Sequence, residues 1–280
     1  MNDYTALVIA YRNHDLIAGV LERLSLQTLP PAEVLVVDNG GTLTDQALAA
    51  WPLRERTRLI SRPDNPGYGA AVNEAMNGTH DAVLVLTHDA MFDPRLAEHL
   101  LESLAAASNR GAAAPVLHFA DQPDRVFSAG GALTRGGRAW HRTDLAHKVS
   151  REVDWVDGAI VMYRRSALDA IGWLAEDYFL YFEDVDTAWR MRRAGFSTVI
   201  VPDAVAFQQP GAHPVYLGIR NMTMFARRAG IPTLAHVGAV SRRIVEESIV
   251  RMRRGRSPEL RAALRGWRDG RRGRSGKPTT

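Results

Sequence analysis

Three carboxylates lie close together in the second half of the chain, with a spacing that suits acid–base chemistry. Glu183, Asp184 and Asp186 follow an aromatic run at 178–182. Such a run is expected to be buried, so ionising all three neighbouring acids costs free energy. The functional interpretation makes one of them a general base. The structural alternative places the acids at a helix N-terminus, where they complement the dipole and Asp186 pairs with Arg190.

A second polar group follows the apolar run Ala82–Thr87, where His88 and Asp89 stand. A carboxylate at the end of a buried strand can hold a divalent cation, and the cation can hold a diphosphate. The alternative is that Asp89 caps or closes a turn before Pro94. The segment by itself leaves both interpretations open.

Two further segments are suited to a nucleotide. Asp38 ends the apolar run Glu33–Val37 and can accept a hydrogen bond from a base or a ribose, although Asp-Asn-Gly-Gly is also ordinary turn chemistry. The second segment, Asn65–Gly69, leads into an expected helix at Gly69–Met76. Its glycines allow a ligand close to the backbone, and the free N–H groups at the helix start favour a phosphate.

Several classes of protein are excluded by what the sequence lacks. No Gly-x-Gly-x-x-Gly follows the first apolar run, and no Gly-x4-Gly-Lys-Ser/Thr occurs in the chain. Dinucleotide-dependent dehydrogenases and P-loop NTPases are therefore not expected. The chain has no cysteine, which removes disulfides, thiolate metal sites and cysteine nucleophiles.

These side chains are positioned by an alternation of strands and helices, which predicts an α/β fold with a mostly parallel sheet and helices on both faces. The expected strands of the first half are Thr5–Tyr11, Glu33–Val37, Arg58–Ser61 and Ala82–Thr87. Shorter runs between residues 112 and 165, separated by glycine pairs, predict a mixed second half of the sheet. Ligands of open α/β sheets bind beyond the carboxyl ends of the strands, which is where Asp38 and Asp89 stand.

The length of 280 residues, with 46% hydrophobic and 24% charged residues, is typical of a folded globular protein. We expect a main α/β domain at 1–230, a C-terminal helical extension at 231–254 and a basic, poorly ordered tail at 255–280. The whole chain has a net charge of +4, whereas residues 251–280 carry +9 and residues 1–250 therefore carry −5. The basic character belongs to the tail.

Within the tail, Leu260, Leu264 and Trp267 can share one helix face with arginines around them, as in an interfacial helix on an anionic membrane. The alternatives are a solvated end or a homo-oligomer contact. Nucleic acid is not expected as a partner, because one aromatic residue offers no stacking platform. The sequence shows no secretory signal and no apolar stretch of about 18 residues, so we expect a cytoplasmic protein, at most peripheral on the inner membrane face.

Taken in order, these segments resemble family 2 glycosyltransferases with the GT-A fold, especially the branch that contains rhamnosyltransferases. The resemblance covers about residues 4–229, so residues 1–230 would form the GT-A domain. It is carried by the segments TALVIAYRN, EVLVVDNGG, NPGYGAAVNEAM, LVLTHDA, VDGAIVMYRRSAL, YFLYFEDVDTAWRMRRAG and YLGIRNMTMFARR.

The resemblance implies a nucleotide-sugar donor. The residues that it assigns to the donor are Ala10, Tyr11, Asp38, Asn65, Gly67, Asn73, His88 and Arg220. Among them, Arg220 would reach the diphosphate. Asp89 matches the last carboxylate of the family's Asp-x-Asp signature and would bind Mg2+ or Mn2+, whereas Thr87 replaces the first. His213 would take the place of a metal-binding His that the family has near Gln209.

The resemblance also implies an inverting hexosyltransferase. Asp184 would take the proton of an acceptor hydroxyl as its oxygen attacks the anomeric carbon, with Glu183 and Asp186 next in line. The acceptor would enter beside Trp155, Asp157 and Gly158.

The resemblance suggests dTDP-rhamnose or a UDP sugar as the donor, and a lipid-linked glycan, a polysaccharide or a small natural product as the acceptor. Thr87 and Gln209 depart from the family pattern. The alternative function is therefore a sugar-nucleotide binding or scaffold protein without turnover, which an assay of donor hydrolysis or transfer would distinguish.

Overall fold

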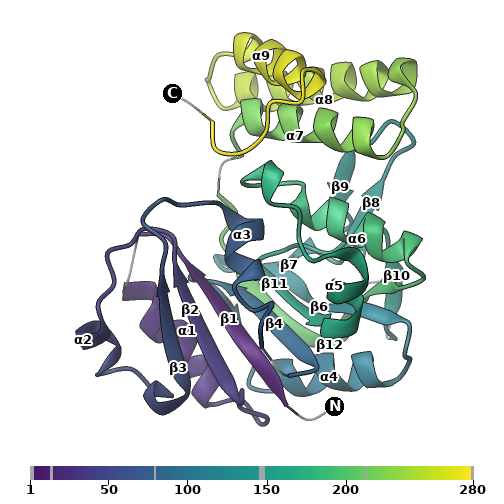
Figure 1. Cartoon of the computed structure of the whole chain (residues 1–280). Coiled ribbons are helices and arrows are strands. Elements are labelled where there is room, and N and C mark those ends of the chain that lie inside the picture. Colours follow the sequence, from purple (N-terminus) through teal and green to yellow (C-terminus); the bar gives the residue numbers. More distant parts are fainter. Residues whose placement is uncertain (1–2, 13–14, 79, 145–148, 212, 279–280) are drawn as a thin grey trace.

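The computed structural model describes residues 3–12, 15–78, 80–144, 149–211 and 213–278. In this part of the chain a ten-stranded mixed sheet is covered by helices on both faces, and a layer of C-terminal helices lies at one end of it (Figure 1). The predicted α/β architecture is confirmed.

The first half of the chain forms the parallel part of the sheet. Its elements are β1 (Tyr4–Ala10), α1 (Asp15–Ser25), β2 (Glu33–Asp38), α2 (Asp45–Leu48), a 3-10 turn (Arg54–Arg56), β3 (Thr57–Ser61), α3 (Tyr68–Asn73), β4 (Ala82–Thr87), β5 (Met91–Phe92) and α4 (Leu96–Ala105). Strand β1 lies between β2 and β4 and is parallel to both. The register pairs Ala10 with Asp38 and Ile9 with Thr87, so the polar strand ends meet at one edge of the sheet.

The second half adds antiparallel strands, as the broken apolar runs predicted. Its elements are β6 (Arg110–Phe119), β7 (Gln122–Ser128), β8 (Gly131–Leu133), β9 (Ala139–His141), β10 (Arg151–Val153), β11 (Ile160–Arg164), α5 (Arg165–Ile171), a 3-10 turn (Glu176–Tyr178), α6 (Glu183–Arg193), β12 (Ser197–Gln208), α7 (Val215–Arg228), α8 (Thr233–Arg253) and α9 (Leu260–Arg271). Strand β11 is antiparallel to β4 and β6, whereas β12 is parallel to β6. Strands β8 and β9 form a separate hairpin.

Two apolar cores fill the two faces of the sheet, because successive side chains of a strand point to opposite sides. Along β1, Ala6 and Val8 pack in the core that includes Ile17 of α1 and Leu100 of α4. Leu7 and Ile9 pack in the opposite core, together with residues of α3 and α5. Burial on both faces explains why the central strands are almost continuously apolar.

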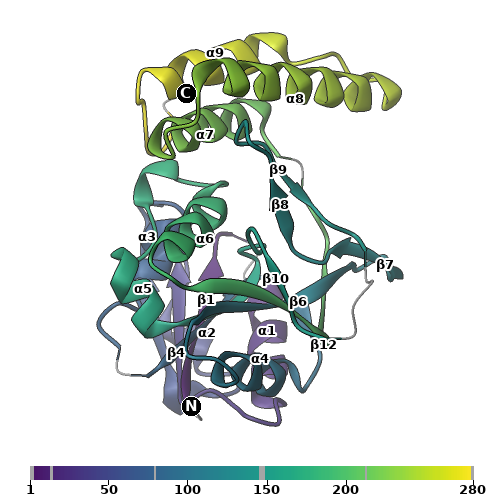
Figure 2. The ribbon, with the colours of Figure 1, turned by 90° about the vertical axis from the view of Figure 1, so that its right-hand side faces the viewer.

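A third core joins the second half of the chain to the C-terminal helices. It includes Phe182 before α6, Phe225 of α7, Val240 of α8 and Ala263 of α9. In Figure 2, α8 and α9 form the outermost layer above α7, and the β8–β9 hairpin reaches toward this layer. An ion pair between Arg138 and Glu246 ties the chain just before β9 to α8.

The tail differs from its predicted poor order, because α9 packs on α7. Small residues make the close approach of the two helices possible. A Cβ on Gly266 would lie 2.5 Å from the carbonyl oxygen of Tyr216, and one on Gly270 would lie 2.5 Å from that of Arg220. The arginines that suggested a solvated chain lie on the other faces of this helix, whose buried residues are Ala263, Gly266, Asp269 and Gly270.

Candidate active site

A strained loop carries the acidic cluster to the start of α6. Phe179 and Phe182 both have positive φ, 68° and 75°, which is uncommon for residues other than glycine. Such conformations persist only where surrounding contacts hold them, and they occur often at functional sites. Here the contacts come from α7, where Asn221 Nδ2 donates to the carbonyl of Leu180 at 2.8 Å and Arg220 Nη2 donates to that of Tyr178 at 2.8 Å.

Three carboxylates line a cavity of about 420 Å3 between the strand ends, α6 and the C-terminal helices. They belong to Asp157, Glu183 and Asp184. Trp155 and Gly158, the other predicted acceptor-side residues, line the same cavity. The remaining wall includes Tyr68, Thr87, Trp140, His141, Tyr181, Gln208, His213, Gly218 and Arg243. The cavity is therefore lined by acidic, aromatic and basic side chains, and the basic ones are histidines and an arginine.

Burial raises the pKa of two of these acids, which makes them better proton acceptors. Glu183 is 5% exposed, and burial raises its pKa to about 7, although hydrogen bonding to the backbone opposes the shift. Its Oε2 is buried without a hydrogen-bond partner among the described residues. Burial, and next the charge of Glu183, raise the pKa of Asp184 well above its usual range. Adjacent carboxylates of this kind titrate together and hold a proton between them near neutral pH.

Asp186, the third predicted acid, has a structural environment. It is fully buried, and its two oxygens form ion pairs with Arg190 at 2.6 Å and Arg228 at 3.1 Å. The hydroxyl of Tyr178 donates a third interaction at 3.1 Å. The predicted pairing of Asp186 with Arg190 is confirmed, and the two ion pairs commit both oxygens of Asp186 to the fold.

His141 is a member of the site that no feature of the sequence indicated. Its Nε2 lies 3.9 Å from Asp157 Oδ2, and its Nδ1 lies 2.9 Å from the hydroxyl of Ser128. Burial lowers the pKa of His141, against the charge of Asp157, which raises it. The other oxygen of Asp157 accepts the N–H of Ala159 at 2.8 Å. His141 comes from the β8–β9 hairpin, whose sequence carries no recognisable motif.

The predicted donor-side residues lie at the edge formed by β1, β2 and β4. Asp38 is fully buried and accepts the backbone N–H groups of Gly40, Thr42 and Leu43 at 2.7–2.8 Å, so it closes the turn after β2. Beside it, Ala10 is buried, whereas the ring of Tyr11 is exposed.

The second donor-side segment contacts the strained loop. Gly67 has a φ of 102°, and a Cβ there would overlap the carbonyl of Phe179. Asn65 also has a positive φ, of 45°. The amide of Asn73 is used within the fold, since it donates to the carbonyl of Leu174 at 3.0 Å and accepts the N–H of the same residue at 3.0 Å. The donor-side segment and the acidic segment are thus parts of one constrained unit.

Arg220, a predicted donor-side residue, is buried and hydrogen-bonded within the fold. It is 1% exposed, and its three donating nitrogens face Asn221 Oδ1 at 2.9 Å, the carbonyl of Tyr178 at 2.8 Å and that of Gly276 at 2.8 Å. This geometry makes Arg220 a positioning residue for the loop before Glu183. It also ties the C-terminal segment to that loop, where Gly276 N–H donates to Asp177 O at 2.7 Å.

Whether the site could bind a divalent cation depends on the side chains that could serve as its ligands. The described residues include no group of three or more His, Asp and Glu side chains that could enclose a metal. Asp89 follows β4 in a turn with His88 and does not line the carboxylate cavity, whereas His213 does line it and stacks on Tyr181 with ring centroids 4.3 Å apart. One carboxylate suits a cation that completes its shell with substrate phosphates and water, which is common for Mg2+.

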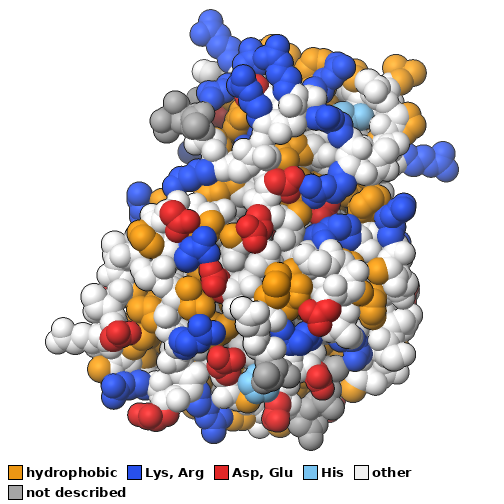
Figure 3. All heavy atoms as spheres, in the orientation of Figure 1, with side chains coloured by type: hydrophobic (Ala, Val, Ile, Leu, Met, Phe, Trp, Pro, Cys, Tyr) orange, Lys and Arg blue, Asp and Glu red, His pale blue; other side chains and the backbone are white. Residues whose placement is uncertain are grey.

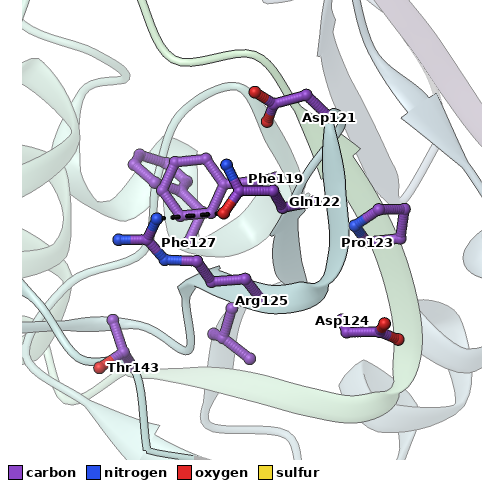
Figure 4. Close-up of a pocket in the computed structure, with 9 residues that line it drawn as sticks. Phe119, Asp121, Gln122, Pro123, Asp124, Arg125, Phe127 and Thr143 are labelled. Carbon is purple, nitrogen blue, oxygen red and sulfur yellow. Dashed lines mark hydrogen bonds between the residues drawn. The ribbon is translucent and has the colours of Figure 1, made fainter.

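A larger hollow of about 880 Å3 lies at the β6–β7 hairpin (Figure 4). Arg125 crosses it, donating to Gln122 Oε1 at 3.3 Å and lying over the ring of Phe119. Its lining residues come from the β6–β7 hairpin and the segment after β9. The carboxylate cavity is therefore the better candidate for chemistry, and the two hollows share Phe127 as a lining residue.

Comparison with known proteins shows which family this chain belongs to. A model of "Glycosyltransferase like family 2" matches residues 2–255. An N-acetylglucosaminyl-diphospho-decaprenol L-rhamnosyltransferase of Mycobacterium tuberculosis is 31% identical over 215 residues, which are 66% of this chain and 68% of that protein. A low-salt glycan biosynthesis hexosyltransferase of Haloferax volcanii is 25% identical over 238 residues, 79% of this chain and 74% of that protein.

Solved structures show the fold. GalNAc-T7 with UDP, GalNAc and Mn2+ has a TM-score of 0.64 at 10% identity, with coverage of 81% of this chain and 48% of that one. A mannosyltransferase of Pyrobaculum calidifontis with GDP-Man and Mn2+ has a TM-score of 0.58 at 20% identity, with coverage of 81% and 63%. The chain thus spans about half to under two thirds of these solved chains. The family model and the mycobacterial relative together show that the chain belongs to glycosyltransferase family 2, and its fold is GT-A.

Proposed function

We propose that this protein is an inverting glycosyltransferase that moves a sugar from a nucleotide-diphosphate donor to an acceptor hydroxyl. The observation that carries the proposal is the grouping of Asp157, Glu183 and Asp184 around one cavity at the strand ends of a family 2 fold. Two of these acids have raised pKa values. A buried carboxylate in this state accepts a proton more readily near neutral pH than a solvated one does.

The proposed base is Asp184. As the acceptor oxygen bonds to the anomeric carbon, its proton passes to the Asp184 carboxylate, and the bond from that carbon to the diphosphate oxygen breaks on the opposite face. A single displacement of this kind inverts the anomeric configuration. Glu183, with a pKa of about 7, stores the other proton of the pair and adjusts the basicity of Asp184.

The leaving diphosphate gains negative charge, which needs a cation close by. Asp89 would hold Mg2+ or Mn2+ together with the donor phosphates, and the bound cation would neutralise that charge. His213 lines the cavity, and burial lowers its pKa, so its imidazole is neutral and able to bind a metal near pH 7.

The proposed donor is dTDP-rhamnose, with UDP sugars as the alternative, and the mycobacterial L-rhamnosyltransferase supports rhamnose. The same relative's name contains a diphospho-decaprenol acceptor, which supports a lipid-linked acceptor here. A panel of sugar nucleotides with Mn2+ tests the donor directly, because a ligand at about 100 times its Kd raises the free energy of unfolding by about 2.7 kcal/mol. Stabilisation by none of the panel would contradict the proposal.

We also propose that the C-terminal helices rest on an anionic membrane, where a lipid-linked acceptor would be found. Along α8, exposed apolar side chains stand at Leu234, Val237, Val245, Ile249 and Met252, spacings of three, eight, four and three residues that keep them near one face of the helix. Leu260 and Leu264 of α9 are exposed as well.

Lys and Arg side chains gather over the same helices in Figure 3. An apolar stripe flanked by arginines suits the interface of an anionic bilayer. None of the described helices is long and apolar enough to cross a bilayer.

The second candidate function is a sugar-nucleotide binding protein without turnover. It is favoured by Thr87 in place of an acid and by the pair Gln208 and Gln209, where the family pattern has a metal-binding His. Thr87 Oγ1 and Gln208 Oε1 are both buried without hydrogen-bond partners among the described residues, so they have capacity for a ligand. Donor stabilisation of the fold without transfer or donor hydrolysis would favour this function.

A further inference from the structure

Arg243 contributes a positive charge to the lining of the carboxylate cavity. No sequence motif indicated this position. It projects from α8 and lines the cavity together with His213 and Gly218, and its charge lowers the pKa of His213. Its Nη1 donates to the carbonyl of Gly218 at 3.3 Å. The charge therefore lies at the helical end of the cavity, inside the same space as the three acids.

Gly218 makes room for this guanidinium. A Cβ at position 218 would overlap Arg243 Nη2, so a side chain there would shift the guanidinium from this position. The glycine is not required by its own backbone, because it lies within a regular helix. Gly in a helix interior costs about 0.5–1 kcal/mol relative to Ala, and the cost here is offset by the position it gives to Arg243.

The charge of Arg243 is not neutralised by an ion pair. No carboxylate among the described residues lies within 4.0 Å of it. The neighbouring charges are paired, since Glu246 of α8 pairs with Arg242 of the same helix and with Arg138 just before β9. Glu247 and Arg138 act on it only at longer range, and burial lowers its pKa. A partly desolvated guanidinium with one carbonyl partner retains donors for an anion.

We propose that Arg243 binds a phosphoryl group of the acceptor substrate. This inference rests on the proposed function. The donor-side residues Ala10, Asp38 and Asp89 do not line the cavity, whereas the proposed metal ligand His213 does. We therefore place the donor phosphates beside Asp89, with His213 between the two substrates. An acceptor that carries its own phosphate beside its sugar would be repelled by Glu183 and Asp184 unless a cation held it. Arg243 supplies that cation and selects phosphorylated acceptors over neutral ones.

The probes are farnesyl-diphospho-N-acetylglucosamine, which carries a diphosphate, and octyl β-N-acetylglucosaminide, which is neutral. With the full chain, Arg243→Gln is expected to raise the KM of the charged acceptor by about 10- to 100-fold, as expected for a lost charged hydrogen bond. The KM of the neutral acceptor and the affinity for dTDP and UDP should stay unchanged. Arg243→Lys should recover part of the loss, and Gly218→Ala should reproduce it with the charge retained.

The matched control is Arg242→Gln, one residue away on the same helix, where the side chain is 72% exposed and pairs with Glu246. It should leave both acceptors unaffected. Equal losses for both acceptors in Arg243→Gln would assign the residue to folding, and lost dTDP or UDP affinity would assign it to the donor; either result overturns the proposal.

A binding measurement keeps the inference separate from the proposed function. Calorimetric titration of the charged probe into the wild type and into Arg243→Gln needs no turnover. A wild type that binds the charged probe, with binding lost in Arg243→Gln, supports the anion site even if no transfer is detected. Equal binding by both proteins, or binding by neither, contradicts it.

Discussion

The side-chain amide of Asn221 donates a hydrogen bond to the carbonyl of Tyr181 at 2.7 Å. Tyr181 has a φ of 71°, and it stands two residues before Glu183. A non-glycine residue in that conformation costs about 1–3 kcal/mol unless its surroundings hold it. The buried side-chain amide of Asn221 on α7 therefore holds Tyr181 in this conformation and fixes the backbone where it enters α6.

Replacing Asn221 by Ala should therefore impair catalysis as well as stability. The change leaves buried carbonyls without a donor, and we expect a loss of about 1–3 kcal/mol in the free energy of unfolding. It should also lower kcat at least tenfold, because the acids lose their fixed position. Thr223→Ala is the control: Thr223 is buried on the same helix and bonds to Ile219 and His236 instead. Equal kcat values in the two variants would show that Asn221 has no positioning role.

Glu183 predicts a pH dependence of stability. Its pKa is raised in the fold from 4.5 to about 7, so the folded state binds more protons than the unfolded state between these values. Stability from this group is full below about pH 4.5 and is lost as the pH rises through 7, by about 1–3 kcal/mol. Glu183→Gln should reduce that decline in urea unfolding between pH 5 and pH 8, with the remainder left to Asp184, whose pKa is also raised. An unchanged decline in the variant would assign it to other groups.

Asp89 predicts a cation-dependent affinity for the donor. Asp89→Ala should weaken dTDP or UDP binding strongly in Mn2+ and only slightly in EDTA, because the carboxylate acts through the cation. Calorimetric titration under both conditions measures this difference. Equal losses would make Asp89 a turn residue, and wild-type transfer that is insensitive to EDTA would exclude a required divalent cation.

The exposed stripe on α8 and α9 predicts binding to anionic vesicles at low salt. Leu234 is 87% exposed and Leu264 is 62% exposed, so Leu234→Glu with Leu264→Glu should reduce sedimentation with phosphatidylglycerol vesicles without unfolding the protein. Leu26→Glu is the control, since Leu26 is 63% exposed and follows α1 instead. Point variants are preferable to deletion of the tail, because α9 packs on α7. Binding that is equal in all three proteins would rule out this surface.

The sequence predicted the strands and helices that carry the polar site residues better than it predicted the contacts of those residues. Asp38, Asp89 and Glu183 lie where strand ends and an aromatic run placed them, because burial and periodicity are local signals. The sequence does not indicate that Arg220 holds the loop before Glu183, since two of its partners are backbone carbonyls more than 40 residues away along the chain. His141 and Arg243 reach the cavity from a hairpin and a late helix, and no pattern within either segment records that contact. The sequence of α9 did not predict its packing on α7, because its many arginines are typical of a solvated segment. These arginines lie on the faces that point away from α7.

The central claim is that Asp184 takes the proton of the acceptor hydroxyl in an inverting transfer. The most direct measurement compares the turnover of the wild type and of Asp184→Asn with the same donor, together with the anomeric configuration of the product. We expect an inverted product from the wild type, and a variant that binds dTDP or UDP normally but turns over about 10² to 10⁴ times more slowly, the usual contribution of a positioned base. Near-normal turnover in Asp184→Asn, or a product of retained configuration, would contradict this account.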